Sequence, residues 1–148
     1  MGNIVFNQAL GRVASLAALP AASDALIAVP LEATGLVNDA TMRDYDDLAS
    51  LLAGASNEQT TMGRKTLTGV TVTVDDATDR VSVSCGVISW TAATGNPIGA
   101  VVICYDPDTT GGTDADLIPL TKHDVTMTPD GNTFNLTASD LFRSTSTA

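Results

Sequence analysis

Apolar and polar residues alternate along residues 70–74 and again along residues 81–85. In the first run valines alternate with threonines, and in the second run valines and a cysteine alternate with serines. This period of two sends successive side chains to opposite faces of a β-strand. The aspartate-rich segment 75–79 between the runs is typical of a hairpin turn. The pattern therefore predicts an antiparallel β-hairpin, preceded by a β-bulge at Gly69, where Leu67 falls out of register with the valines.

A second kind of strand signal lies further along the chain. Residues 100–105 are apolar without alternation, which is typical of a central strand that is covered on both faces. Shorter runs follow, and the Pro-Asp-Gly-Asn segment at 129–132 has the composition of a tight turn. We expect further strands over residues 117–121, 125–128 and 133–137, and a last strand around Leu141 and Phe142.

The N-terminal part of the chain has helical rather than strand periodicity. Apolar residues at helical spacing predict a short amphipathic helix over about residues 7–18, which Gly11 weakens. A second helix is predicted over about residues 41–53, because its start resembles a capping box and Gly54 supplies a C-terminal stop. One or two short helices are therefore expected before the strands begin.

These elements together predict a mainly β fold, an antiparallel β-sandwich or barrel-like domain. We expect residues 64–148 to form this domain and residues 1–63 to form an N-terminal arm and helical segment. Within the arm, residues 25–29 are a short apolar run that ends at Pro30, a pattern that favours an edge strand. The polar residues 55–63 are typical of a flexible connection.

Composition narrows the classes of function. The chain has 148 residues, of which 44% are hydrophobic, so it can bury a core as one domain. Its 17 acidic residues against 7 basic ones give a net charge of -10, which disfavours a nucleic-acid partner. Cys85 and Cys104 lie in strand-like runs and are expected to be buried free thiols. No signal peptide or membrane span is recognisable, so we expect cytoplasmic synthesis and no membrane partner.

Three features contain residue types that catalysis or ligand binding uses. The loop 106–116 carries carboxylates at alternate positions, as Ca²⁺ sites do, but Leu117 stands where an EF-hand requires a bidentate glutamate. His123 and Asp124 are neighbours in a predicted strand, so they point to opposite faces. Trp90 suits either core packing or a sugar-stacking surface. We favour a solvated acidic loop, a non-catalytic histidine and a buried tryptophan, and we predict no enzyme, no cofactor and no metal site.

Several segments of the chain resemble a family of small structural proteins of tailed bacteriophages. The shared features are an N-terminal segment of the Asn-Ile-Val-Phe-Asn type, a Leu-Thr-Gly strand with an aspartate hairpin, and a Trp-Thr junction. They lie at residues 3–7, 67–72, 75–80, 88–91, 99–106, 117–118 and 130–134. The resemblance covers most of the chain from about residue 64 onward, and the predicted helix at 41–53 has no counterpart that we expect from the family.

The resemblance implies a capsid decoration or minor head protein of the virion. We therefore expect the chain to be made in the host bacterial cytoplasm, to bind the major capsid protein on the outer capsid surface, and to stabilise the capsid. It carries over no catalytic residue. An alternative from another class is a host-attachment or glycan-binding module of a phage fibre or tail, which requires exposed aromatic residues.

Self-association and contact residues complete the expectations. Closed symmetry favours a homotrimer first and a homodimer second. Apolar residues near the N-terminus are the candidates for contact with the capsid or with another subunit, although packing in the chain's own core is an equally good interpretation of them. These residues are Ile4, Val5, Phe6, Leu10, Val13 and Leu16.

Overall fold

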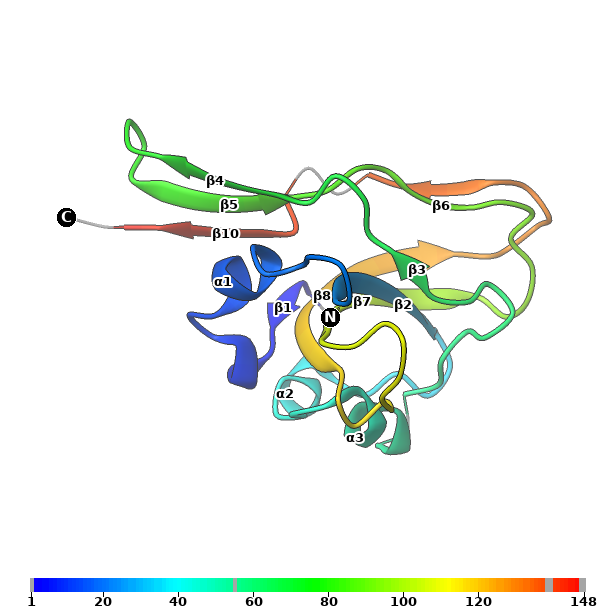
Figure 1. Cartoon of the computed structure of the whole chain (residues 1–148). Helices are drawn as coiled ribbons and strands as arrows, with labels where there is room; N and C mark the ends of the chain where they lie inside the picture. Colours follow the sequence, from blue (N-terminus) through cyan, green and yellow to red (C-terminus); the bar gives the residue numbers. More distant parts are fainter. Residues whose placement is uncertain (1, 55, 138–139, 147–148) are drawn as a thin grey trace.

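The computed structural model describes residues 2–54, 56–137 and 140–146, and it confirms the predicted mainly β fold with antiparallel sheets (Figure 1). The main sheet has five strands in the order β1-β8-β7-β2-β3. In chain order these strands are β1 (Ile4–Val5), β2 (Ala25–Glu32), β3 (Lys65–Thr66), β7 (Ile98–Asp106) and β8 (Ile118–Met127).

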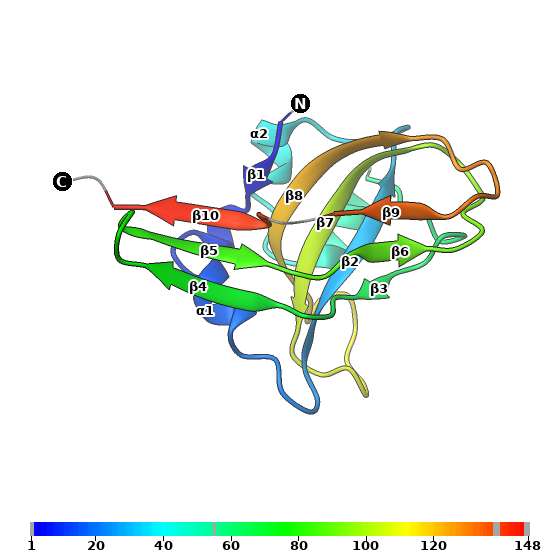
Figure 2. The same cartoon turned by 90° about the horizontal axis from the view of Figure 1, so that it is seen from above.

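A second layer of strands lies over one face of the main sheet (Figures 1 and 2). Part of it is a three-stranded sheet in the order β10-β5-β4, which we call the β-wing; its strands are β4 (Thr71–Asp75), β5 (Arg80–Ser84) and β10 (Phe142–Thr145). The other part is the pair β6 (Ile88–Trp90) and β9 (Phe134–Leu136). Figure 2 shows that the β-wing projects beyond the main sheet on the side away from β6 and β9.

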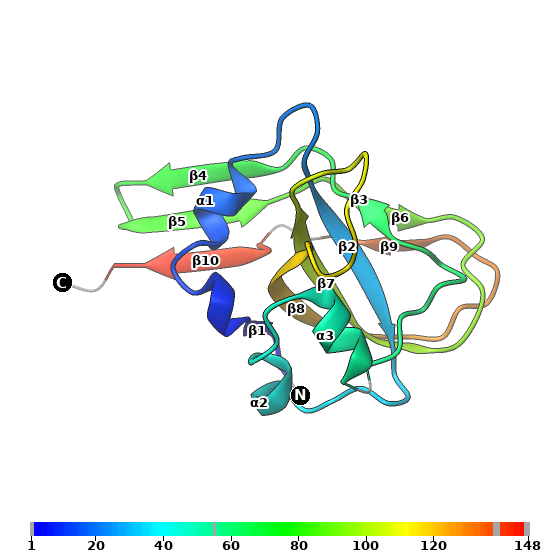
Figure 3. The same cartoon turned by 60° about the horizontal axis from the view of Figure 1, so that its bottom comes forward.

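The described part of the chain also contains four short helices. They are the 3₁₀ helix η1 (Asn7–Ala9) and the α-helices α1 (Val13–Ala17), α2 (Asp39–Met42) and α3 (Leu48–Ala53). Figure 3 shows α2 and α3 on the face of the main sheet that is opposite the second layer of strands. It also shows α1 packed against the β-wing. In the described residues, no helix is long and apolar enough to cross a membrane.

Each of the two predicted helices is interrupted. Gly11, with φ +75°, separates η1 from α1, so the helix predicted over residues 7–18 is wrong in its continuity. The helix predicted over residues 41–53 is likewise two helices, because Asp47 caps a new helix by accepting a hydrogen bond from the Ser50 N–H at 2.7 Å. Its predicted stop at Gly54 is confirmed.

The predicted hairpin and central strand are both confirmed. β4 pairs with β5 around the turn at residues 76–79, and β7 lies between β8 and β2 with residues 100–104 all buried. Gly69 has φ +61°, and the Gly86 N–H donates to the Thr68 carbonyl at 2.7 Å. That bond is one residue out of the β4–β5 register, as a bulge at Gly69 requires.

Strand β2 is longer and more central than expected. It continues through Pro30 to Glu32 and pairs with β7 over its whole length, so the predicted edge strand over residues 25–29 is wrong. The Pro30 carbonyl accepts a hydrogen bond from Gln59 on the side away from β7. Because the nitrogen and the carbonyl of one strand residue point to the same side, the missing N–H of Pro30 costs no bond to β7.

Residues 1–63 and 64–148, expected as an arm and a β domain, share one sheet and one core. β2, from the first segment, pairs with β3 and β7 from the second. Buried apolar residues of both segments belong to one cluster, which includes Phe6, Leu31 and Leu51 as well as Trp90.

Candidate functional site

The structure separates the six predicted contact residues into two groups. Phe6, Val13 and Leu16 are at most 6% exposed and pack in the chain's own core. Phe6 is also held by its N–H, which donates to the Leu120 carbonyl of β8 at 3.1 Å. These three side chains are therefore core residues, and no partner can reach them in this structure.

The other three predicted contact residues remain accessible to different degrees. Ile4 and Val5 are half-buried and pair with Lys122 and Thr121 at the edge of the main sheet. Leu10 is 61% exposed in the short connection between η1 and α1. Leu10 is thus the predicted contact residue that offers most of its side chain to a partner.

In the part of the chain that the structure describes, three further large apolar residues are exposed, and they were not among the predicted contact residues. They are Leu19, after α1, Val74, near the end of β4, and Val87, after β5. Alternation places Val74 on the same face as Val72, which packs against the core. Val74 is nevertheless 71% exposed, because the β-wing projects past the layer that would cover it. Alternation predicts on which face of a strand a side chain lies. It does not predict where the layer that covers this face ends.

A buried ion network anchors the N-terminal residues. The Lys122 ammonium is fully buried and contacts Asp39 at 2.7 Å and Asp124 at 2.6 Å. Asp39 also accepts a hydrogen bond from the Gly2 N–H at 2.6 Å, and the Asn3 side chain accepts one from the Asp124 N–H at 2.9 Å. The hydrogen bond from Lys122 lowers the pKa of Asp39. Strand β1 is therefore held to α2 and β8 by charge as well as by sheet pairing.

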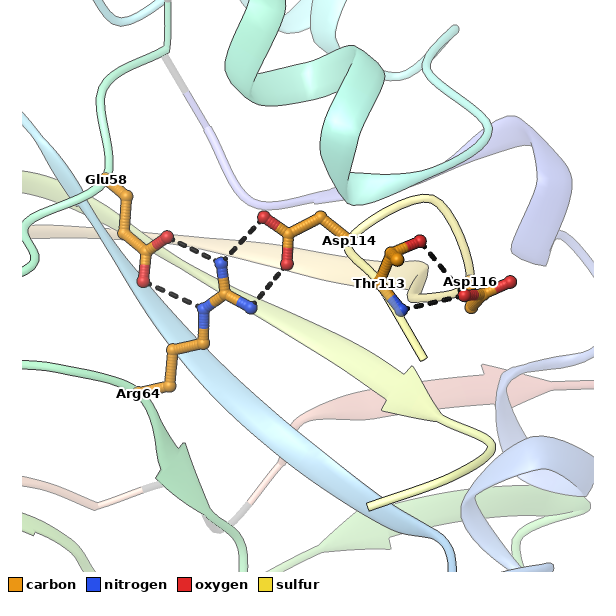
Figure 4. A network of polar contacts seen from close by, with 5 residues as sticks. All are labelled: Glu58, Arg64, Thr113, Asp114 and Asp116. Carbon is orange, nitrogen blue, oxygen red and sulfur yellow. Dashed lines mark hydrogen bonds and ion pairs between the residues drawn. The ribbon is translucent and has the colours of Figure 1, made fainter. Parts of the chain in front are cut away.

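Arg64 forms a second polar cluster, with Glu58 and Asp114 (Figure 4). Its guanidinium binds both oxygens of Glu58, at 2.8 and 2.6 Å, and both oxygens of Asp114, at 2.6 and 3.0 Å. These bonds raise the pKa of Arg64 and lower that of Asp114. Such forked pairs fix geometry strongly, and here they tie the loop 106–116 to the segment that enters β3.

A pocket of about 530 Å³ opens beside this cluster, lined by Arg64, Ile27 and much of the acidic loop. Two of the loop carboxylates already accept hydrogen bonds from neighbouring residues of the loop. Asp108 accepts hydrogen bonds from Thr110, and Asp116 accepts them from both the N–H and the hydroxyl of Thr113. Within residues 2–54, 56–137 and 140–146, no three His, Cys, Asp or Glu side chains gather closely enough to hold a metal ion. The cluster acts as a structural tie between loops.

The other residues that the sequence suggested for binding or catalysis make contacts within the fold. Trp90 is 1% exposed, stacks on Phe134 and donates from Nε1 to the Gly63 carbonyl at 2.8 Å, which confirms its core assignment. The His123 ring lies 3.0 Å from the Thr121 hydroxyl, and burial lowers its pKa. Asp124 contacts Lys122. Both cysteines are free thiols, as predicted.

Comparison with known proteins adds no relative to this description. No family model matches the sequence, and neither the curated proteins nor the solved structures provide a match. The functional interpretation therefore depends on the resemblance described above and on the residues that the fold exposes. Within the residues that the structure describes, Leu10 and Val74 are the two most exposed large apolar side chains.

Proposed function

We propose that this chain is a structural protein of a bacteriophage particle that binds the shell of major capsid protein from outside and stabilises it. The observation that carries the proposal is the exposure of Leu10, at 61%, shortly after the segment 3–7 that resembles the N-terminal segment of phage structural proteins. Removing a leucine side chain from water contributes about 1.5–3 kcal/mol, so an exposed leucine favours an apolar partner.

The segment around Leu10 is held rigidly, so its exposure does not result from a frayed terminus. Phe6 and Val13, on either side, are both buried in the core. The N-terminal residues before them are fixed by the ion network of Lys122. A rigid apolar residue loses little conformational entropy on binding, which increases the net affinity of a contact.

The charge of the chain supports the same proposal. A net charge of -10 opposes aggregation before the chain reaches a shell. A protein that stabilises a shell requires contact area and a rigid scaffold, and the mainly β fold provides the scaffold. The proposal assigns the chain no chemical reaction.

The test is binding of the purified chain to capsids assembled without it. We expect the wild-type chain to sediment with the capsids and Leu10→Ser to bind about tenfold more weakly, because the leucine burial is lost. Val87→Ser is the matched control, since Val87 is similarly exposed but lies outside the N-terminal segment. A wild-type chain that does not sediment with the capsids rejects the proposal, and equal losses in both variants reject the role of Leu10.

The alternative, a host-attachment or glycan-binding module, lacks support from the aromatic residues. Trp90 is in the core, and the Tyr105 hydroxyl donates to Asp24 at 2.7 Å rather than facing a ligand. The Trp90 ring is buried and the Tyr105 hydroxyl already has a partner, so neither side chain combines an exposed ring with a free polar group, as a sugar-stacking surface does. We therefore retain the capsid-binding proposal.

A further inference from the structure

The hydrogen bonds of the β-wing show which backbone groups of β4 point outward. On the far side of β5, the Ser146 N–H donates to the Asp79 carbonyl and the Leu141 N–H donates to the Val83 carbonyl, each at 2.8 Å. Odd-numbered residues of β5 therefore direct their backbone groups toward β10. Since the direction alternates along a strand, even-numbered residues such as Ser82 direct theirs toward β4.

The register between β4 and β5 shows which residues of β4 bond to β5. Ser84, Ser82 and Arg80 lie opposite Thr71, Thr73 and Asp75. These three residues of β4 thus bond to β5, and the N–H and C=O groups of Val72 and Val74 point away from the sheet. No described residue pairs with these groups, because β4 is an edge of the β-wing. An edge strand of this kind is a template for another strand.

The side chains beside this edge of β4 leave a space between them. A groove of about 530 Å³ lies next to the start of β4. Most of the residues that line it are apolar, and they include Leu67, Val70 and Val72 together with Ala17, at the end of α1, and Ala18, Pro20 and Ala21, which follow it. Figure 2 shows α1 behind the β-wing, and the loop after it extends past β4 on the side that faces away from β5. A strand added to β4 would lie along this groove.

We propose that two copies of this chain pair through β4, antiparallel, about a twofold axis that passes between their Thr73 residues. The outward-pointing residues are symmetric about Thr73, so Val72 of each copy faces Val74 of the other, and both exchange backbone hydrogen bonds. The two β-wings then form one continuous sheet. This inference does not depend on the capsid-binding proposal, and it favours a homodimer over a homotrimer.

The same symmetry operation accounts for the exposed Val74 and the open groove together. Residues directly opposite in antiparallel strands have their side chains on the same face. Val74 of one copy would therefore lie beside Val72 of the other, and Val72 lines the groove. Val74, the most exposed large apolar side chain among the described residues, thus reaches the groove of the partner copy, and the contact is reciprocal.

Charge is compatible with this arrangement and makes it salt-dependent. In the proposed register Asp75 lies opposite Thr71 of the second copy, so no carboxylate of β4 faces another. The net charge of -10 on each copy nevertheless repels the other copy at long range. Added salt screens this repulsion, so dimerisation should strengthen with ionic strength. Binding of a basic strand from another protein would weaken instead.

Disulfide trapping is the most direct test. Thr73 lies on the exposed face of β4, and the Cα atoms of a non-hydrogen-bonded antiparallel pair are about 4.5 Å apart, within disulfide range. We expect Thr73→Cys to form a covalent species of twice the monomer mass of 15.2 kDa under mild oxidation. Thr71→Cys is the matched control, because the two Thr71 residues lie on opposite sides of the axis. Equal cross-linking in both variants would overturn the proposed register.

Sedimentation equilibrium of the uncross-linked protein tests the dimer itself. We expect a monomer–dimer equilibrium that tightens with salt, and a loss of affinity of at least about tenfold in Val74→Lys, with no change in the control Val87→Lys. A wild-type chain that stays monomeric, or a dimer that Val74→Lys leaves intact, rejects the proposal. If the chain is monomeric and Val74→Lys instead weakens capsid binding, the edge belongs to a strand of the shell.

Discussion

Lys122 has its ammonium fully buried in the middle of β8, with Asp39 and Asp124 as its two charged partners. Burial of an ion is costly unless its partners remain in place, and removing them leaves an uncompensated charge. The two carboxylates differ from the ammonium because their side chains are 21% and 32% exposed and so keep contact with water. Removing the two carboxylates therefore leaves a buried charge, whereas removing the ammonium leaves charges that reach water.

This asymmetry predicts the order of two variants. The double substitution Asp39→Asn and Asp124→Asn leaves a buried, unpaired ammonium and should lower the free energy of unfolding by about 3–5 kcal/mol. Lys122→Met should cost less, since the remaining carboxylates reach solvent. Urea unfolding of both variants measures the two losses. A larger loss in Lys122→Met would contradict the asymmetry.

The same network predicts a pH dependence of stability. The pKa of Asp39 is lowered from its ordinary value of 3.8, first by the hydrogen bond from Lys122 and then by that from the Gly2 N–H. A lowered pKa means that the stabilisation is present above 3.8 and is lost as the pH falls through the folded-state pKa. The difference in unfolding free energy between wild type and Asp39→Asn should therefore be full at neutral pH and shrink below about pH 4. A difference that is independent of pH would contradict this.

Among the elements, the break between η1 and α1 has a clear cause. Gly11 has φ +75°, a left-handed conformation that costs other residues about 1–2 kcal/mol. A Cβ at Gly11 would meet no atom within 4 Å, so Gly11→Ala should lose stability through backbone strain alone. Gly2→Ala is the control, because Gly2 has similar space and no positive φ. Chemical denaturation of both variants should show a loss for Gly11→Ala only.

Strand β8 illustrates what sequence pattern could not predict. Two strands were expected, over residues 117–121 and 125–128, because Lys122, His123 and Asp124 interrupt the apolar pattern. The structure has one strand from Ile118 to Met127. The partner that allows Lys122 to be buried is Asp39, 83 residues away in sequence. Alternation revealed β4 and β5, and a continuous apolar run revealed β7, but neither pattern predicts a buried ion whose counter-charge is distant in the sequence.

The candidate sites show a similar limit. Leu10 is exposed and belongs to the set of predicted contact residues. Phe6 and Val13 belong to the same set and are equally apolar, but they are buried. Helical periodicity cannot distinguish them, because the chain turns at Gly11 and places Leu10 outside the packed face. The Arg64 cluster joins residues 58, 64 and 114, and no spacing in the sequence connects the last of these to the others. Both features depend on tertiary placement.

At the scale of the whole molecule, the body and the β-wing differ in how they are supported. β7 is buried between two strands of the main sheet, whereas the β-wing has open edges and an exposed apolar tip. Regions with few buried contacts open locally at a lower free energy than the core. We therefore expect the β-wing to open without unfolding the main sheet.

Amide hydrogen exchange of wild type and Val102→Ala tests this expectation. Val102 is fully buried in β7, and its truncation should lower the free energy of global opening by about 2 kcal/mol. Amides of β7 should lose that protection, while amides of β5 should change little, because opening of the β-wing leaves Val102 packed. Exchange is best measured at low protein concentration, so that pairing through β4 does not protect the edge. Equal losses in β5 and β7 would show instead that the β-wing and the main sheet unfold as one cooperative unit.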